Sequence, residues 1–496
     1  MFVKGYEGII IIIMVFLKKN FGIFAVLLLS FWAIRSLIIP GFFPMHDDTQ
    51  VARVFEMGKM LGSGVFPVRW VPDLGYGYGY PIFNFYAPLA YYVCGGFMLF
   101  GFDALLATKI MMAVGVILAG AFMYFLAREF FGELGGAVAG LFYTYAPYHA
   151  VDIYVRGDVA EFWAYAFIPL AFLGIYKKNI LIGSIGFAGL ILSHNLTAMM
   201  VTPFLLIAIL LYCYIAPKGK KLLILHHSSL ILFLGLAASA FYWVPALFEM
   251  KYTNVLSQIG GGADFRDHFV CPLQLWSSPW GFGGSTKGCI DGLSFMIGKL
   301  HIFSVFLSIL ILIYLRLKHK YFNNIYYLSI FSIVGFLISI FLMLDMSKFL
   351  WKTIFPMAFF QYPWRFLILT SFFASLVSGA VIWFLTIHLG GALPPSPRLR
   401  WTSRSPPRWA AGIGFAILIF LLIFFNSKLF EPQTIVPKTA SDYTNEYALK
   451  WTASKISDEF LSPDFKKPKS EKDVSKNPIS FKETTLQKTS NAVSLI

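Results

Sequence analysis

Long apolar runs recur along the chain and set its architecture. Crossing the hydrocarbon core of a bilayer takes about 20 apolar residues in a helix. Runs near that length lie at about 21–40, 104–126, 135–150, 162–176, 180–193, 196–215, 229–248, 300–315, 325–344, 365–388 and 410–426. Because several runs are short, the pattern predicts an all-α polytopic membrane protein with about 11 transmembrane helices, in a range of about 10–13.

Two further apolar stretches are predicted not to cross. The stretch 8–17 is too short and ends at Lys18 and Lys19, so residues 1–20 are expected to form a cytoplasmic, interfacial N-terminus. The stretch 80–101 contains two prolines, a glycine pair and many aromatic rings, which prefer the depth of the lipid headgroups. It suits a re-entrant or interfacial helix.

Composition agrees with the hydrophobic pattern. The chain is 58% hydrophobic and only 13% charged, whereas soluble domains are about 45–50% apolar and about 25% charged. The net charge of +15 would suggest nucleic acid in a soluble protein. Here the basic residues cluster between apolar runs, as in cytoplasmic loops, so we expect contact with membrane lipids and no nucleic acid.

One alternation of the spans, with the N-terminus in the cytoplasm, puts every short basic cluster inside. These clusters are Lys18/Lys19, Arg128, Lys177/Lys178, Lys218/Lys220/Lys221, Arg316/Lys318/Lys320 and Arg398/Arg400/Arg404/Arg408. The same alternation predicts that the functional face is extracytoplasmic.

The long connections then all lie outside. Within the transmembrane domain, 21–426, they include the loops 41–103 and 249–299, and a polar tail follows at 427–496. We expect about 427–462 to pack on the outer face and the rest of the tail to be disordered, because it is rich in charged residues and poor in apolar ones. No inner loop can hold a nucleotide-binding unit, so the energy for an outer reaction must arrive on a lipid carrier.

The first outer loop opens with proton-handling side chains. His46, Asp47 and Asp48 follow the first span directly, and apolar residues then recur at helical spacing, as in an amphipathic helix lying on the outer surface. One reading makes Asp47 a helix cap that pairs with Gln50 in a capping box. The other makes Asp47 a general base, since a carboxylate close to a like charge takes up a proton more readily.

Three outer arginines could hold a phosphate group. Arg69, Arg156 and Arg365 are the candidates, because a guanidinium binds phosphate through two parallel hydrogen bonds. For each of them, snorkelling towards the interface is the alternative.

Further polar residues are candidates for the same site. Asp158 and Glu161 are neighbours if their segment is helical. They could assist Asp47 or bind a divalent cation, or form an internal salt bridge with Arg156. His194 interrupts the chain between two spans and either contacts the site or ends a helix.

These motifs resemble those of a known superfamily. The acidic pair, followed by "DLGYGYGYPIFNFYAPLAYY" (73–92) and "YFLAREFFGELGGAVAGL" (124–141), resembles the GT-C integral membrane glycosyltransferases. The segments "YAPYHAVDIYVRGDVAEFWAYAFIPL" (145–170), "LSHNLTAMM" (192–200) and "FQYPWRFL" (360–367) are similar to uncharacterised bacterial membrane proteins labelled as 6-pyruvoyl-tetrahydropterin synthase-related. The chain has no His-rich zinc site of the kind a pterin synthase needs.

The resemblance implies transfer of a sugar from a polyprenyl-phosphate donor to a glycan, lipid or protein acceptor. It makes Asp47 the base and Asp48 the second acidic residue, where many members have Glu. If a divalent cation takes part, Asp47, Asp48 and Glu161 are its expected ligands; no other cofactor is implied. A lipid or polysaccharide flippase or transporter, and a non-catalytic scaffold, are the alternatives.

A first prediction concerns Cys271 and Cys289, which share a glycine-rich outer loop. We expect them to form a disulfide, because cysteines in an oxidising compartment tend to pair. Reduction should shift the electrophoretic mobility of the protein, and Cys271→Ser should abolish that shift. Two thiols that alkylate freely under native oxidising conditions would contradict the pairing.

Overall fold

The computed structural model describes residues 20–255, 260, 263–319, 324–388, 409–474, 480–481 and 484–485. Within these residues, nine helical segments are long and apolar enough to cross a membrane. They are Phe21–Ile38, Ala104–Thr144, Val159–Lys177, Asn195–Ile215, Lys218–Ala238, Lys299–Lys318, Asn324–Met343, Pro363–Ile387 and Gly412–Phe430. The protein is therefore an all-α polytopic membrane protein, as the apolar pattern predicts.

The main helices follow the predicted runs closely, although one of them, Ile180–Ser193, is shorter and is not among these nine segments. In chain order they are α2 (Phe21–Leu29), α3 (Phe31–Ile38), α7 (Ala104–Thr144), α9 (Val159–Lys177), α10 (Ile180–Ser193), α11 (Asn195–Ile215), α12 (Lys221–Ala238), α15 (Lys299–His319), α16 (Asn324–Met343), α18 (Leu367–His388) and α19 (Trp409–Asn426). The prediction for 229–248 is wrong in its boundaries: α12 ends at Ala238, and α13 (Ala240–Glu249) begins after a break at Ser239. The Ser239 hydroxyl there donates to the Gly235 carbonyl oxygen at 2.8 Å.

Helix α7 contains two of the predicted runs, joined by a sharp reversal. Gly132 has φ 71° and ψ −170°, far from helical values. The two arms then pack back to back, because a Cβ on Gly140 would lie 2.7 Å from the Gly120 carbonyl oxygen. Residues on both sides of Gly132 are thus in direct backbone contact, and α7 is a helical hairpin.

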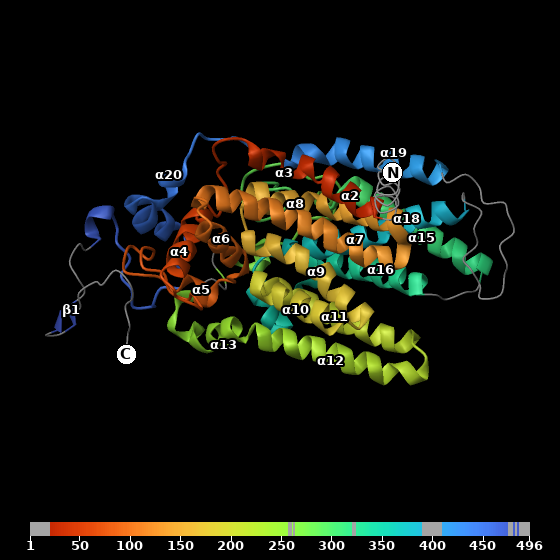
Figure 1. Cartoon of the computed structure of the whole chain (residues 1–496), viewed down its shortest axis with the longest axis horizontal. Coiled ribbons are helices and arrows are strands. Elements are labelled where there is room, and N and C mark those ends of the chain that lie inside the picture. Colours follow the sequence, from red (N-terminus) through yellow and green to blue (C-terminus); the bar gives the residue numbers. More distant parts are fainter. Residues whose placement is uncertain are drawn as a thin grey trace, which may run out of the picture.

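The aromatic stretch 80–101 is too short to cross. It forms α5 (Ile82–Phe85) and α6 (Leu89–Leu99). Eleven residues in α6 rise by about 16 Å, about half of the hydrocarbon thickness of roughly 30 Å. Helix α6 packs against α4 (Gln50–Gly62) and α5 packs against α13, at the end of the bundle where α20 (Ala440–Thr444) also lies (Figure 1).

Helix α4 forms where the amphipathic pattern predicts it, but its polar face is covered. Arg53 is only 4% exposed and Glu56 is fully buried, whereas the sequence pattern places both on the outer surface. The C-terminal tail covers Arg53, which donates to the Ser457 hydroxyl at 2.9 Å. Glu56 instead accepts from the Asp73 amide at 3.1 Å. A polar helical stripe therefore packs against other polar segments of the same chain.

The tail approaches the first outer loop at more than one place. Phe42 and Val436 pair as an antiparallel bridge, with N–H to O distances of 2.9 and 2.7 Å. Beyond η10 (Ser427–Phe430), the tail forms α20, η11 (Ala448–Ala453), α21 (Ser454–Ile456), η12 (Glu471–Asp473) and the two-stranded pair of β1 (Ser480–Phe481) with β2 (Thr484–Thr485). The predictions for residues 1–19 and for most of the chain beyond 474 fall outside the described residues.

The hairpin contact in α7 gives a second prediction. Gly140→Ala should destabilise the protein by about 1–3 kcal/mol, since the new methyl group meets backbone that cannot move aside. The matched control is Gly96→Ala in α6, where a Cβ meets nothing within 4 Å and the better helix former should be neutral or stabilising. Thermal unfolding in detergent measures both, and equal stability of the two variants would contradict the close contact.

Candidate functional site

The connection between α7 and α9 carries a group of buried charges. It consists of α8 (Pro147–Val151), the π-helical turn η1 (Asp152–Arg156), Gly157 and Asp158. Gly157 has φ 66°, and a Cβ there would lie 2.1 Å from the Met45 sulfur, so glycine fits this turn for two reasons. Asp158 then caps α9 by accepting a hydrogen bond from the Glu161 amide at 3.1 Å.

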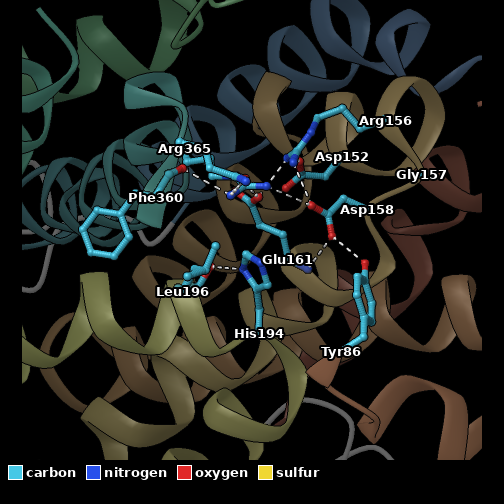
Figure 2. Close-up of polar contacts among 12 residues, drawn as sticks. Tyr86, Asp152, Arg156, Gly157, Asp158, Glu161, His194, Leu196, Phe360 and Arg365 are labelled. Carbon is cyan, nitrogen blue, oxygen red and sulfur yellow. Dashed lines mark hydrogen bonds and ion pairs between the residues drawn. The ribbon is translucent and has the colours of Figure 1, made fainter. Parts of the chain in front are cut away.

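Arg156 lies at the centre of a buried ion cluster (Figure 2). Its Nη2 donates to Asp158 Oδ2 at 2.7 Å, and its Nη1 donates to Glu161 Oε2 at 2.9 Å. Nη1 also donates to Asp152 and, at 3.0 Å, to the Tyr148 hydroxyl. Both terminal nitrogens of Arg156 are thus engaged by the protein itself.

Arg365 reaches the same carboxylates from the start of α18. It belongs to η9 (Pro363–Phe366), and its Nη2 and Nε lie 3.8 Å from Asp158 Oδ2 and 3.3 Å from Glu161 Oε2. Its Nη1 donates to the Phe360 carbonyl oxygen at 3.2 Å, whereas its Nε is buried without a hydrogen bond. Arg365 therefore keeps hydrogen-bonding capacity that Arg156 has used.

The neighbouring charges fix the ionisation of Asp158 and His194. Burial acts to raise the pKa of Asp158, but Arg156, His194 and Arg365 outweigh it, and the pKa falls well below its usual range. Burial also lowers the pKa of His194 more than the nearby carboxylates raise it. At neutral pH Asp158 is an anion and His194 is uncharged.

The opening of the first outer loop is held directly against this cluster. The His46 amide donates to the Val155 carbonyl oxygen at 3.1 Å, and the Asp47 amide donates to that of Arg156 at 2.9 Å. Burial raises the pKa of Asp47, and the charge of Asp158 raises it further, against the opposing charge of Arg53. Asp47 is thus electrostatically part of the cluster.

The capping reading of Asp47 is wrong. Helix α4 begins at Gln50 and its N-cap residue is Thr49. The Gln50 side chain donates to the Gly157 carbonyl oxygen at 2.7 Å instead of completing a capping box. In the part of the chain that the structure describes, the Asp47 carboxylate forms no hydrogen bond or ion pair, and the residue is partly exposed.

The other candidates from the first loop point elsewhere. Asp48 forms an ion pair with Lys438 of the tail at 3.9 Å. The His46 ring lies 3.0 Å from the Phe282 carbonyl oxygen, in the loop that the Cys271–Cys289 disulfide closes. The exposed Arg69 donates to the Phe241 carbonyl oxygen at 3.4 Å, and no ion pair between described residues joins it to the cluster.

Several residues of the site carried no separate signal in the sequence. Asp152 and Tyr148 lie within the segment 145–170, but nothing in the sequence distinguishes either residue from its neighbours there. Arg53 was read as part of a solvated face, yet its guanidinium lies 4.5 Å from the ring of Tyr86. Tyr86 in turn donates to Asp158 at 3.4 Å, which links α4 to the cluster.

The residues that could hold a metal ion differ from the expected set. Asp158, Glu161 and His194 offer ligand atoms within 4.8 Å of one another. Glu161 is shared with the expected set of Asp47, Asp48 and Glu161, whereas Asp48 faces the tail.

The fold is similar to that of solved membrane oligosaccharyltransferases. The structure of the oligosaccharyltransferase AglB from Archaeoglobus fulgidus, in complex with an inhibitory peptide and a dolichol-phosphate, is similar with a TM-score of 0.50 and 13% identity, over 91% of this chain and 62% of that one. The Archaeoglobus fulgidus oligosaccharyltransferase tethered to an acceptor peptide is similar with a TM-score of 0.51 and 14% identity, over 95% and 61% of the two chains. At these identities the likeness shows the fold alone.

Sequence comparison adds little to this. No family model matches the chain. A protein of Lactococcus lactis subsp. cremoris (strain MG1363), described as an uncharacterized protein, is 26% identical over 255 residues. That match covers 48% of this chain and 41% of the relative, so the chain spans less than half of the relative's length.

The cluster gives a third prediction. Arg156→Met should destabilise the protein by about 3–5 kcal/mol, because it leaves buried carboxylates without their partner. Arg69→Met removes the same charge from an exposed position, where substitutions usually change stability by less than about 0.5 kcal/mol. Thermal unfolding in detergent at neutral pH compares the two, and similar midpoints would show that the ion cluster is not structural.

Proposed function

We propose that the protein is a membrane glycosyltransferase that moves a sugar from a polyprenyl-phosphate donor to an acceptor at the extracytoplasmic face. The observation that carries the proposal is the Asp47 carboxylate, which is part of a buried charged cluster and yet has no partner of its own among the described residues. The GT-C-type fold supports it.

Asp47 is the general base of the proposed reaction. An acceptor hydroxyl or amide must lose a proton as it attacks the sugar, and a carboxylate within hydrogen-bond reach can take that proton. Because burial and the charge of Asp158 raise its pKa, Asp47 binds a proton more readily than an ordinary aspartate does. Its backbone bond to Arg156 holds it beside the arginines that would receive the donor.

Arg365 is the group that holds the departing phosphate. A guanidinium stabilises phosphate by charge and by paired hydrogen bonds. The Nε of Arg365 has no hydrogen bond, whereas Arg156 has its terminal nitrogens fully engaged. We therefore assign phosphate binding to Arg365 and the structural centre of the cluster to Arg156.

The remaining assignments follow the sequence and the neighbours. The two oligosaccharyltransferases were solved with a dolichol-phosphate and with an acceptor peptide, which supports a polyprenyl-phosphate carrier here and leaves a glycan, lipid or peptide as acceptor. The basic clusters support a cytoplasmic N-terminus in a bacterial-type plasma membrane. The similarity to proteins labelled 6-pyruvoyl-tetrahydropterin synthase-related predicts that these proteins are related to this chain. It assigns no activity to the chain.

A fourth prediction tests the base. Asp47→Asn should lower the rate of transfer by about a hundredfold to ten-thousandfold, since the amide cannot take a proton, while donor binding survives. In the wild type, the rate should fall as the pH drops through the raised pKa of Asp47, because only the ionised carboxylate acts as a base. The assay is transfer or hydrolysis from a panel of polyprenyl-phosphate sugars with purified protein.

The matched control is Asp103→Asn. Asp103 is exposed and caps α7 by accepting from the Leu106 amide at 2.8 Å, and Asn caps about as well as Asp. Its transfer rate should equal that of the wild type. Near-normal transfer by Asp47→Asn with a working donor would remove Asp47 from the mechanism.

A further inference from the structure

We infer that this site works without a divalent cation, because two guanidinium groups occupy the carboxylates that would ligate one. The inference concerns Asp158, Glu161 and His194, whose ligand atoms lie close enough together to suggest a metal site. Only the catalytic consequence of this inference rests on the proposed function. The claim that no divalent cation binds rests on the geometry of the site.

Every oxygen of the two carboxylates already has a donor. Asp158 Oδ1 accepts from the Glu161 amide at 3.1 Å, and its Oδ2 accepts from Arg156 at 2.7 Å. Glu161 Oε1 accepts from the Tyr148 hydroxyl at 2.6 Å, and its Oε2 accepts from Arg156 at 2.9 Å. A metal ion could bind only by displacing these donors.

The ligand atoms that are not already hydrogen-bonded are too few for a stable metal site. His194 uses its Nδ1 against the Thr197 hydroxyl at 2.7 Å, which leaves one ring nitrogen. The Asp47 carboxylate and the buried Asp152 Oδ2 also lack hydrogen bonds, but neither residue belongs to the group whose ligand atoms lie within 4.8 Å of one another. Zn²⁺ sites take about four ligands, three of them from the protein even when catalytic, and Mg²⁺ demands about six in a near-octahedral arrangement.

Charge opposes the ion as well. Arg156 and Arg365 both lie within ion-pair distance of Asp158 and Glu161, so the two negative charges already face two positive ones. All four side chains are at least nine-tenths buried, where charges interact more strongly than in water. A divalent cation placed among them would be repelled by both guanidinium groups.

For the proposed reaction, the inference means that a guanidinium group, and not a metal ion, neutralises the charge of the departing phosphate. In the proposed transfer, the bond between the anomeric carbon and the phosphate oxygen breaks, and the electron pair leaves with the phosphate. Arg365 lies next to the same two carboxylates, and its buried Nε has no hydrogen bond. Its guanidinium takes the role that a bound cation would otherwise fill.

Metal binding tests the inference without any substrate. Purified protein is stripped with EDTA and titrated with Mn²⁺, followed by electron paramagnetic resonance, and with Zn²⁺, followed by elemental analysis. We expect no stoichiometric site that depends on Asp158. One Mn²⁺ or Zn²⁺ per chain that is lost in Asp158→Asn overturns the inference.

A variant tests the repulsion that Arg365 exerts on a cation. Arg365→Gln removes one guanidinium from the carboxylates and should bind Mn²⁺ at least about tenfold more tightly than the wild type, because a repelling charge has been removed. Arg69→Gln makes the same charge change outside the cluster and should gain nothing. A folded Arg365→Gln protein without this gain overturns the exclusion by Arg365.

The two proposals fail in different ways. Once a working donor is found, transfer should be unchanged in EDTA; transfer that is lost in EDTA and restored by Mn²⁺ overturns the present inference and leaves the transferase assignment intact. Failure of every polyprenyl-phosphate sugar as a donor would remove the proposed function, while the metal titrations of wild type and variants would still decide the binding claim.

Discussion

The buried guanidinium of Arg156 is the interaction on which the outer end of this molecule depends. It joins Asp152, Asp158 and Glu161, and taking several charges out of water costs far more than one ion pair returns unless each has a partner. The requirement is strict in both directions: the carboxylates need the guanidinium, and the guanidinium needs all of them. The turn between α7 and α9 places all four of these side chains together.

The turn between α7 and α9 contacts several segments that are distant in the sequence. The first outer loop binds it through the amides of His46 and Asp47, and α18 contributes Arg365. Trp364 lies with its ring 4.7 Å from Arg156 and donates to the Ser285 hydroxyl at 3.1 Å, which connects the disulfide loop. The tail joins through Arg53 and Ser457. A change in the cluster therefore reaches every outer segment.

The sequence predicts the helices well because a lipid-crossing helix needs a long apolar run, and this signal is local. The reversal at Gly132 is also local, since two predicted runs sit on either side of it. The site is different. Asp47 and Asp48 are adjacent and chemically identical, yet one joins the cluster and the other pairs with Lys438. Nothing near them in the sequence distinguishes the two, because the decisive partners lie far along the chain. The buried polar face of α4 was missed for the same reason, as the cover of Arg53 comes from Ser457.

The depth of the charges argues for chemistry at the membrane surface. Within the described spans, Asp, Glu, Lys and Arg residues lie near the helix ends or the turn at Gly132: Glu161 is in the first turn of α9, and Arg365 is the third residue of its span. A transporter would place such groups near the midplane, where an ion or substrate crosses. Here the ion cluster lies at the start of α9 and of the span that begins at Pro363, where the loop that carries Asp47 packs against it. The proposed transfer needs only this arrangement: a phosphate carried on a membrane lipid and an acceptor would meet at the end of the spans, beside the partly exposed Asp47.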